Sequence, residues 1–143
     1  MSKIVELNTL TEAQMQEVIG LMGELDPTIT VTEEMVRRTV EAPGTHFIAV
    51  TAEGHIIGCA SLCVFDSPTG RKASIEDVVV ASAFRGQHIG KQLMQHIIEY
   101  AKTLAPINLQ LTSRPERVAA NKLYHSLGFQ KRETNAYRME ILD

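Results

Sequence analysis

The chain has 143 residues, of which 44% are apolar, and its formal net charge is -3 at pH 7. These values indicate one soluble globular domain, residues 1–143, with a single substantial core. The slightly acidic balance argues against a nucleic-acid-binding protein, because such proteins usually carry a basic stripe. No segment approaches the roughly 20 apolar residues of a membrane helix, and residues 1–4 do not resemble a signal peptide. We therefore expect a cytoplasmic protein with no membrane or nucleic-acid partner.

Hydrophobic periodicity and turn residues predict an alternation of strands and helices along the chain. In order, the predicted elements are a strand at 4–7, helices at 11–25 and 32–42, strands at 47–51, 56–64 and 75–81, a helix at 89–104, a strand at 109–112, a helix at 115–128 and a closing pair of strands within 129–141. Three successive strands imply antiparallel pairing, whereas the strand, helix and strand within 75–112 imply a parallel crossover. We expect an α/β (α+β) fold with a mixed, mostly antiparallel central sheet flanked by helices.

The clearest element boundaries come from local chemistry. Residues 11–14, Thr-Glu-Ala-Gln, form a capping box at the start of the first helix. Residues 53–55, Glu-Gly-His, suit a hairpin turn between two strands, and Gly128 suits the C-terminus of the last helix.

Cys59 and Cys63 lie four residues apart in a strand-like run. Residues with this spacing share one face of a strand but sit about 13 Å apart, which is too far for a disulfide. No second Cys/His pair completes a zinc ligand set, so we expect packing thiols and no metal site.

The segment with the most chemical content, Arg85–Lys91, joins a predicted buried strand to a long predicted helix. Unpaired N–H groups at a helix N-terminus and the helix dipole together favour a phosphate or pyrophosphate. Arg85 and Lys91 add positive charge, Gly86 lets the backbone approach an anion, and Gly90 leaves room for it. Two other phosphate loops, the Walker pattern and the dinucleotide fingerprint, are absent. The alternative is an ordinary turn in which both glycines serve geometry only.

Two segments resemble those of a known family. Val80–Gly90, with the sequence VASAFRGQHIG, resembles motif A of the Gcn5-related N-acetyltransferase (GNAT) family, whose Arg/Gln-x-x-Gly-x-Gly/Ala amides hold the coenzyme A pyrophosphate. Ala119–Phe129, with the sequence AANKLYHSLGF, resembles the family's C-terminal motif, in which an Asn and a Tyr face the cofactor thiol. His88 departs from the usual Gly, although the family's glucosamine-6-phosphate N-acetyltransferases also have a larger residue there. The His88 side chain either points outward or lies beside a phosphate.

The resemblance covers nearly the whole chain and implies an N-acetyltransferase. Such an enzyme transfers the acetyl group of acetyl-CoA to a primary amine of a small molecule or peptide by direct attack in a ternary complex. In relatives, the main chain of the strand before motif A pairs with the pantetheine, and one of its N–H groups polarises the thioester carbonyl. The implied cofactor-binding residues are Val78, Val79, Val80, Arg85, Gly86, Gln87, His88, Ile89, Gly90, Lys91, Asn121 and Tyr124.

Two residues are candidates for catalysis. The amine must lose a proton before it attacks a thioester, and Glu76, which corresponds to a glutamate in the family's diamine acetyltransferases, is the candidate base. Water or substrate groups are the alternative route for this proton. Asp77 is expected to face the other side of the strand by simple alternation. Tyr124 matches the family's general acid for the departing thiolate, and the alternative is a half-buried packing aromatic.

Two rival functions remain open. The run Ile75–Val80 and the non-glycine residue at position 88 suit an aminosugar N-acetyltransferase of the glucosamine-6-phosphate type, which would need a further basic cluster for the sugar phosphate. A non-catalytic acyl-CoA sensor would need neither Glu76 nor Tyr124. The sequence identifies neither the amine acceptor nor the preferred acyl chain, and the resemblance allows a homodimer.

Overall fold

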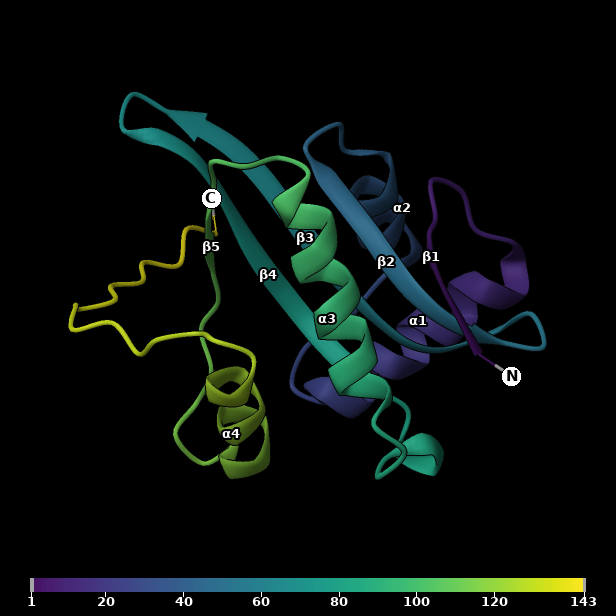
Figure 1. Ribbon diagram of the computed structural model, residues 1–143. Coiled ribbons are helices and arrows are strands. Elements are labelled where there is room, and N and C mark those ends of the chain that lie inside the picture. The colour runs from purple at the N-terminus through teal and green to yellow at the C-terminus, as the bar shows by residue number, and fades with distance from the viewer. Residues whose placement is uncertain (1, 143) are drawn as a thin grey trace. The chain divides into compact units, whose positions relative to one another are not determined.

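The computed structural model describes residues 2–142, in two compact units that comprise residues 1–112 and 113–143. The first unit contains a five-stranded sheet in the order β1-β2-β3-β4-β5 (Figure 1). Its strands are β1 (Ser2–Glu6), β2 (Thr45–Ala52), β3 (His55–Ser67), β4 (Gly70–Val80) and β5 (Asn108–Gln110). Neighbours from β1 to β4 pair antiparallel, and β5 lies parallel to β4. The predicted mixed, mostly antiparallel sheet is confirmed.

Helices cover both faces of this sheet. They are α1 (Glu12–Leu25), α2 (Glu33–Glu41) and α3 (Ile89–Lys102), and a short 3-10 helix, η1 (Ser82–Phe84), precedes α3. In Figure 1, α3 crosses the front of the sheet, whereas α1 and α2 lie behind it. The predicted parallel crossover is confirmed: α3 links β4 to β5, and these two strands pair in parallel.

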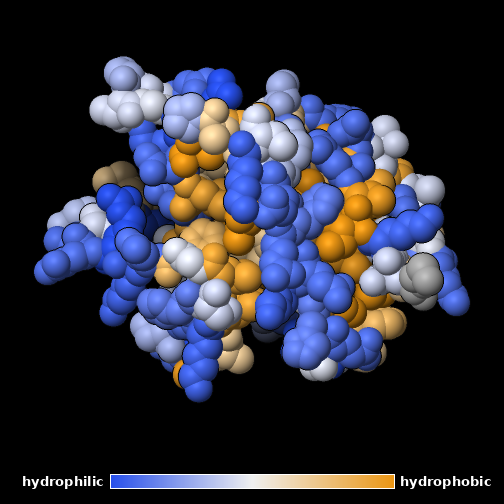
Figure 2. All heavy atoms as spheres, viewed as in Figure 1, coloured by the Kyte–Doolittle hydropathy of each residue, from blue (hydrophilic) through white to orange (hydrophobic). Residues whose placement is uncertain are grey.

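The core is built on both faces of the sheet. Behind the sheet, α1 and α2 bury one continuous apolar cluster that includes Met15, Val18, Leu21, Val36, Val40, Phe47, Ala49, Cys59 and Val79. On the other face, Leu93, Met94 and Ile97 of α3 are completely buried. The outward face of α3 is hydrophilic, as the blue column in Figure 2 shows. An apolar stripe of this kind fixes the axis of α3 and therefore the position of its N-terminus.

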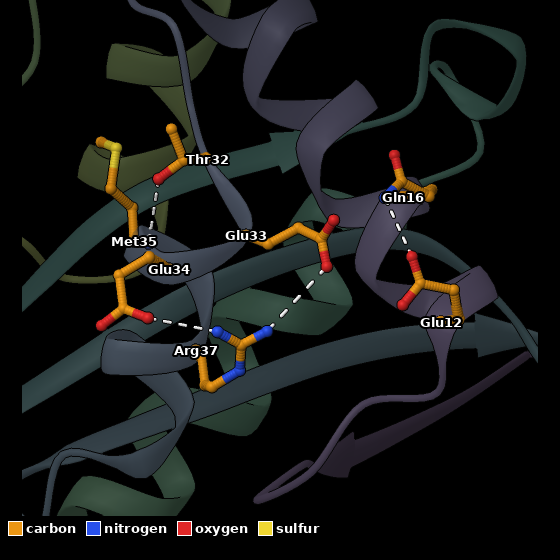
Figure 3. Close-up of polar contacts among 7 residues, drawn as sticks. All are labelled: Glu12, Gln16, Thr32, Glu33, Glu34, Met35 and Arg37. Carbon is orange, nitrogen blue, oxygen red and sulfur yellow. Dashed lines mark hydrogen bonds and ion pairs between the residues drawn. The ribbon is translucent and has the colours of Figure 1, made fainter.

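Local side-chain contacts start the two N-terminal helices. The capping box of α1 is formed as predicted: the Thr11 N–H donates to Gln14 Oε1 at 3.0 Å, and the Gln14 N–H donates to Thr11 Oγ1 at 3.1 Å. Thr32 Oγ1 caps α2 by accepting from the Met35 N–H at 3.2 Å, and Arg37 pairs with Glu34 at 3.1 Å (Figure 3). This exposed ion pair contributes only about 0.3–0.5 kcal/mol, so burial of the apolar face dominates the stability of α2.

Two predicted turns are confirmed. Glu53 and Gly54 both have positive φ, 52° and 82°, as a tight two-residue hairpin between β2 and β3 requires. Gly128 has a φ of 102°, and its N–H donates to the carbonyl of His125 at 3.1 Å just after α4 (Val118–Ser126). Glycine is the residue that enters this left-handed region without steric cost, and both turns follow from that property.

The predicted closing pair of strands within 129–141 is wrong. Residues 129–142 form no strand, and α4 begins at Val118, later than the predicted start at 115. The sequence alternates as a strand would, but Tyr137, Met139 and Ile141 are exposed by 90%, 83% and 77%. A segment with alternating apolar residues forms a strand only when its backbone pairs with a neighbouring strand. Residues 130–142 make no backbone hydrogen bonds with the described part of the chain.

Candidate active site

β4 contains a bulge at the acidic pair. Ser61 of β3 lies opposite Glu76, and Cys59 lies opposite Val79, so β4 carries one more residue than β3 between these two pairs. Asp77 lies within this stretch and has a φ of 54°, which is the left-handed conformation of a bulge residue. The extra residue interrupts the regular alternation of side chains, so alternation alone does not decide which side of the strand Asp77 faces. A bulge also leaves backbone groups of its strand outside the regular ladder.

Glu76 reaches solvent at this bulge. Its side chain is exposed, and its Oε1 atom accepts a hydrogen bond from Ser74 Oγ at 3.0 Å. Burial, assisted by the Asp77 carboxylate, raises the pKa of the Cys59 thiol to about 12. Burial also raises the pKa of the Cys63 thiol, with the charges of Glu76 and Asp77 in the same direction. Both thiols therefore stay protonated at neutral pH, which agrees with packing roles.

The connection from β4 to α3 is a turn with two left-handed residues. After η1, Gly86 has a φ of 82° and His88 a φ of 63°, and α3 begins at Ile89. His88 occupies the N-cap position, where its side chain makes no capping hydrogen bond. The first hydrogen bond of the helix runs from the Gln92 N–H to the His88 carbonyl at 3.0 Å. The N–H groups before Gln92 therefore face the end of the helix without the usual carbonyl partner.

These open N–H groups form a candidate anion site, which we call the cofactor turn (residues 85–91). No described residue accepts a hydrogen bond from the N–H groups of Gly86, Gln87 or His88. Together with the helix dipole of α3 and the exposed side chains of Arg85 and Lys91, they favour a phosphate or pyrophosphate at this point.

The two glycines of the cofactor turn have different roles. A Cβ atom at Gly86 would meet no atom within 4 Å, but the positive φ disfavours other residues. At Gly90, a Cβ atom would lie 3.7 Å from the Val80 side chain, which is ordinary contact. The protein's own packing therefore does not demand a glycine at position 90. The short distance between Gly90 and the Val80 side chain also shows that the end of β4 lies against the first turn of α3. Of the two preceding residues in β4, Val78 is partly buried and Val79 is buried.

Arg85 is held by two groups on the protein side of the turn. Its Nε atom donates to the Val80 carbonyl at 3.2 Å, and its Nη2 atom lies 3.7 Å from Oε1 of Glu24. The same Glu24 oxygen accepts a hydrogen bond from the Ser82 N–H at 2.9 Å. Glu24 could not be found from the sequence alone, because it lies 58 residues before Ser82 and belongs to no motif.

Asn121 and Tyr124 lie on α4 and belong to the second unit. Asn121 Nδ2 donates to the Arg114 carbonyl at 3.0 Å, so its amide is oriented by the loop before α4. Tyr124 is buried and meets Phe129 edge to face, with ring centroids 6.1 Å apart. Burial raises the pKa of the Tyr124 phenol above its ordinary value, while the charge of Arg117 acts in the opposite direction. The phenol therefore carries its proton at neutral pH.

The structure thus groups the sequence-predicted residues into two sets. Glu76, the end of β4 and the cofactor turn lie in the first unit, and Asn121 and Tyr124 lie in the second. That the two sets meet at one site stays a prediction.

Among the described residues, no group of three or more His, Cys, Asp or Glu could hold a metal ion, and none of the described helices is long and apolar enough to cross a bilayer.

A mixed sheet whose bulged strand leads to a helix N-terminus with open N–H groups is suited to a ligand that carries a phosphate. Comparison with known proteins defines the class further. The sequence model of the acetyltransferase (GNAT) family matches residues 11–129, so the chain belongs to this family.

Relatives and solved structures agree with this assignment. Glucosamine 6-phosphate N-acetyltransferase 1 of Oryza sativa subsp. japonica is 29% identical over 108 residues, which cover 68% of this chain and 66% of that protein. A putative acetyltransferase from Agrobacterium tumefaciens str. C58 superposes with a TM-score of 0.84 at 21% identity and covers 96% of this chain and 99% of that one. AAC(6')-Iy, in complex with the bisubstrate analogue CoA-S-monomethyl-acetylneamine, superposes with a TM-score of 0.77 at 18% identity, over 99% of both chains. At these identities, the two structures show a shared fold.

The left-handed backbone of His88 predicts a stabilising substitution. His88→Gly should raise the free energy of unfolding by about 1 kcal/mol, because glycine adopts a positive φ without the steric cost of a Cβ atom. The measurement is urea denaturation of both proteins. Gln87→Gly is the matched control: φ at Gln87 is not positive, so the added backbone freedom should lower the stability instead. Equal effects of the two substitutions would contradict the assignment of strain to His88.

Proposed function

We propose that the chain is an N-acetyltransferase that transfers the acetyl group of acetyl-CoA to a primary amine of a small molecule or peptide. The observation that supports this most directly lies in the cofactor turn: the N–H groups of Gly86, Gln87 and His88 have no partner in the described chain and stand at the N-terminus of α3, where an anion is favoured. Membership of the acetyltransferase family supplies the reaction class. The reaction proceeds in one ternary complex, because the amine attacks the thioester directly.

The cofactor turn holds the pyrophosphate of acetyl-CoA in this proposal. The backbone N–H groups of Gly86, Gln87, His88, Ile89, Gly90 and Lys91 act as donors, and Arg85 and Lys91 supply positive charge. β5 pairs with β4 only from Lys72 to Ser74, so the edge of β4 that faces away from β3 has main-chain groups available near Val78 and Val79 for the pantetheine arm. One N–H of this stretch polarises the thioester carbonyl and stabilises the oxyanion that develops during attack. Asn121 hydrogen-bonds the cofactor arm from α4.

Two side chains move protons. A free amine has a pKa of about 10 and is mostly protonated at neutral pH, so Glu76 takes a proton from it directly or through water. The amine nitrogen then forms a bond to the acetyl carbon, and the carbon–sulfur bond breaks. The nitrogen loses its second proton to solvent at this stage, and solvent later returns a proton to Tyr124. The Tyr124 phenol donates its proton to the departing thiolate, and its raised pKa keeps that proton available over a wider pH range.

An aminosugar phosphate is a second candidate acceptor. The rice relative named above is a glucosamine 6-phosphate N-acetyltransferase, and it aligns over 68% of this chain. An acceptor of that kind needs basic side chains for its sugar phosphate. The two acceptor classes can be separated by incubating the protein with acetyl-CoA and primary amines, with and without a phosphate group, and measuring the free coenzyme A thiol that is released. Binding of acetyl-CoA with no thiol released in the presence of any of the amines would instead indicate a sensor.

The cofactor turn can be tested with a pair of glycines in the same conformation. Gly86 and Gly54 both have a φ of 82°, and an added Cβ atom would meet nothing within 4 Å at either position. Replacement by alanine therefore costs similar backbone strain, about 1–2 kcal/mol, at both positions. Gly86→Ala should also weaken acetyl-CoA binding by about tenfold or more, whereas Gly54→Ala should leave it unchanged. The measurement is calorimetry at a temperature where both variants are folded, and equal affinities would place the pyrophosphate elsewhere.

Tyr124→Phe tests the proposed general acid. The substitution keeps the ring that packs on Phe129, so acetyl-CoA affinity and folding should stay near those of the wild type. The turnover number should fall by about 10²–10⁴-fold, because the departing thiolate loses its proton donor. In the wild type, turnover should decline only above the ordinary tyrosine pKa, since the raised pKa keeps the phenol protonated to higher pH. Wild-type turnover in the Phe variant would leave Tyr124 with a packing role only.

Glu76→Gln tests the proposed base through its pH dependence. Glu76 is exposed, so the substitution should change the stability little. It should reduce kcat/KM most at pH values where the amine is protonated, and the defect should shrink as the pH approaches the pKa of the amine. The measurement is the pH profile of kcat/KM for both proteins. A defect of constant size across that range would assign the proton transfer to water or to the substrate.

A further inference from the structure

Glu24 is a carboxylate that the proposed mechanism does not use, and it lies against the cofactor turn. It stands in the last turn of α1, while the turn follows β4, so the contact joins two distant segments of the first unit. Its Oε1 atom accepts from the Ser82 N–H at 2.9 Å and lies 3.7 Å from Arg85 Nη2. One oxygen therefore contacts both the start of η1 and the side chain at the start of the cofactor turn.

The contact with Ser82 supplies a cap that η1 lacks. Ala81 precedes this short helix and makes no side-chain capping hydrogen bond, so the first N–H of η1 would otherwise face water. A carboxylate at the N-terminus of a helix is also favoured by the local dipoles. The hydrogen bond is charge-assisted, which makes it stronger than one between neutral groups. It ties the residues between β4 and Arg85 to the C-terminal end of α1.

The contact with Arg85 restricts the guanidinium. Arg85 is anchored by Nε to the Val80 carbonyl at 3.2 Å and by the charge of Glu24 near Nη2. An arginine has five N–H donors, so donors remain for an anion while the side chain is held at the turn. Both side chains are partly exposed, 58% for Arg85 and 37% for Glu24, so screening by water makes the ion pair the weaker of the two Glu24 contacts.

We propose that Glu24 is a positioning residue that preorganises the cofactor turn through the Ser82 N–H. This inference rests on the proposed binding of acetyl-CoA by that turn. A turn held in place before the ligand arrives binds more tightly, because less conformational freedom is lost on binding. Glu24 makes no contact with the cofactor or the amine and acts only through Ser82 and Arg85.

The chain contains a matched control on the same helix. Glu17 of α1 also accepts a backbone hydrogen bond, from the Ile56 N–H at 3.0 Å, and contacts a basic side chain, His55 Nδ1, at 2.7 Å. These contacts hold the hairpin between β2 and β3 and do not involve the cofactor turn. Glu17→Ala and Glu24→Ala therefore remove the same kind of tether from two different turns.

The test is calorimetry with coenzyme A on Glu24→Ala, Glu24→Gln and Glu17→Ala, with hydrogen exchange of the Ser82 amide in the ligand-free proteins. Glu24→Ala should weaken coenzyme A binding about five- to tenfold and speed exchange at Ser82. Glu24→Gln keeps an oxygen acceptor, so affinity and exchange should both return toward wild-type values. Glu17→Ala should leave both unchanged. In steady-state kinetics, Glu24→Ala should raise KM for acetyl-CoA but not KM for the amine.

Several results would overturn this role. Unchanged affinity in Glu24→Ala, despite faster exchange at Ser82, would make Glu24 a structural residue only. Equal gains in affinity for the Ala and Gln variants would show that its charge repels the pyrophosphate. A raised KM for the amine alone would place Glu24 at the acceptor. Failure of the wild type to bind coenzyme A would contradict the proposed function, and exchange at Ser82 would still show whether Glu24 holds the turn.

Discussion

The N–H groups in the first turn of an α-helix have no hydrogen-bond acceptor within the helix. In this protein the helix is α3, and its first turn follows the C-terminal end of β4 after a short connection. The N–H groups ahead of Gln92 have no carbonyl one turn earlier in α3. The N-cap residue, His88, does not satisfy them with its side chain. Among the residues that the structure describes, none accepts a hydrogen bond from the N–H groups of the preceding residues Gly86 and Gln87 either. The turn therefore presents a set of donors that a phosphate group can satisfy.

The rest of the first unit holds this turn in place. Complete burial of Leu93, Met94 and Ile97 fixes α3 on one face of the sheet. On the other face, α1 extends to the start of η1, where Glu24 accepts the Ser82 N–H. The bulge in β4 shifts the register between Glu76 and Val79, directly before the strand reaches the turn. The cofactor turn, the packing of the sheet and the position of the acidic pair are thus parts of one connected arrangement.

The features that local chemistry determines were predictable from the sequence. The capping box at Thr11, the hairpin at Glu53 and Gly54 and the glycine after α4 each depend on a few adjacent residues, and all three are confirmed. The fold class and the family were predicted as well, because strand and helix periods and two motifs extend over most of the chain.

Features that depend on distant partners were not predictable. The run Ile75–Ala81 reads as a regular strand, and only the register with β3 shows the bulge. Glu24 carries no local signal, since its partner lies 58 residues away. The alternation at Tyr137, Met139 and Ile141 predicted a strand, although strand formation also requires a neighbour. The roles of Glu76, Asn121 and Tyr124 stay predictions for the same reason, since they require groups from two units to meet.

In the function that we propose, coenzyme A binds at the cofactor turn through backbone N–H groups. The most direct test is a titration of ¹⁵N-labelled protein with coenzyme A, followed by the amide resonances of Gly86, Gln87, His88, Ile89, Gly90 and Lys91. We expect these amides to shift together along one saturable binding curve, with large changes for Gly86, Gln87 and His88, while the amide of Gly54 stays in place. Saturable shifts that spare residues 86–91 and appear elsewhere in the sheet would contradict this proposal.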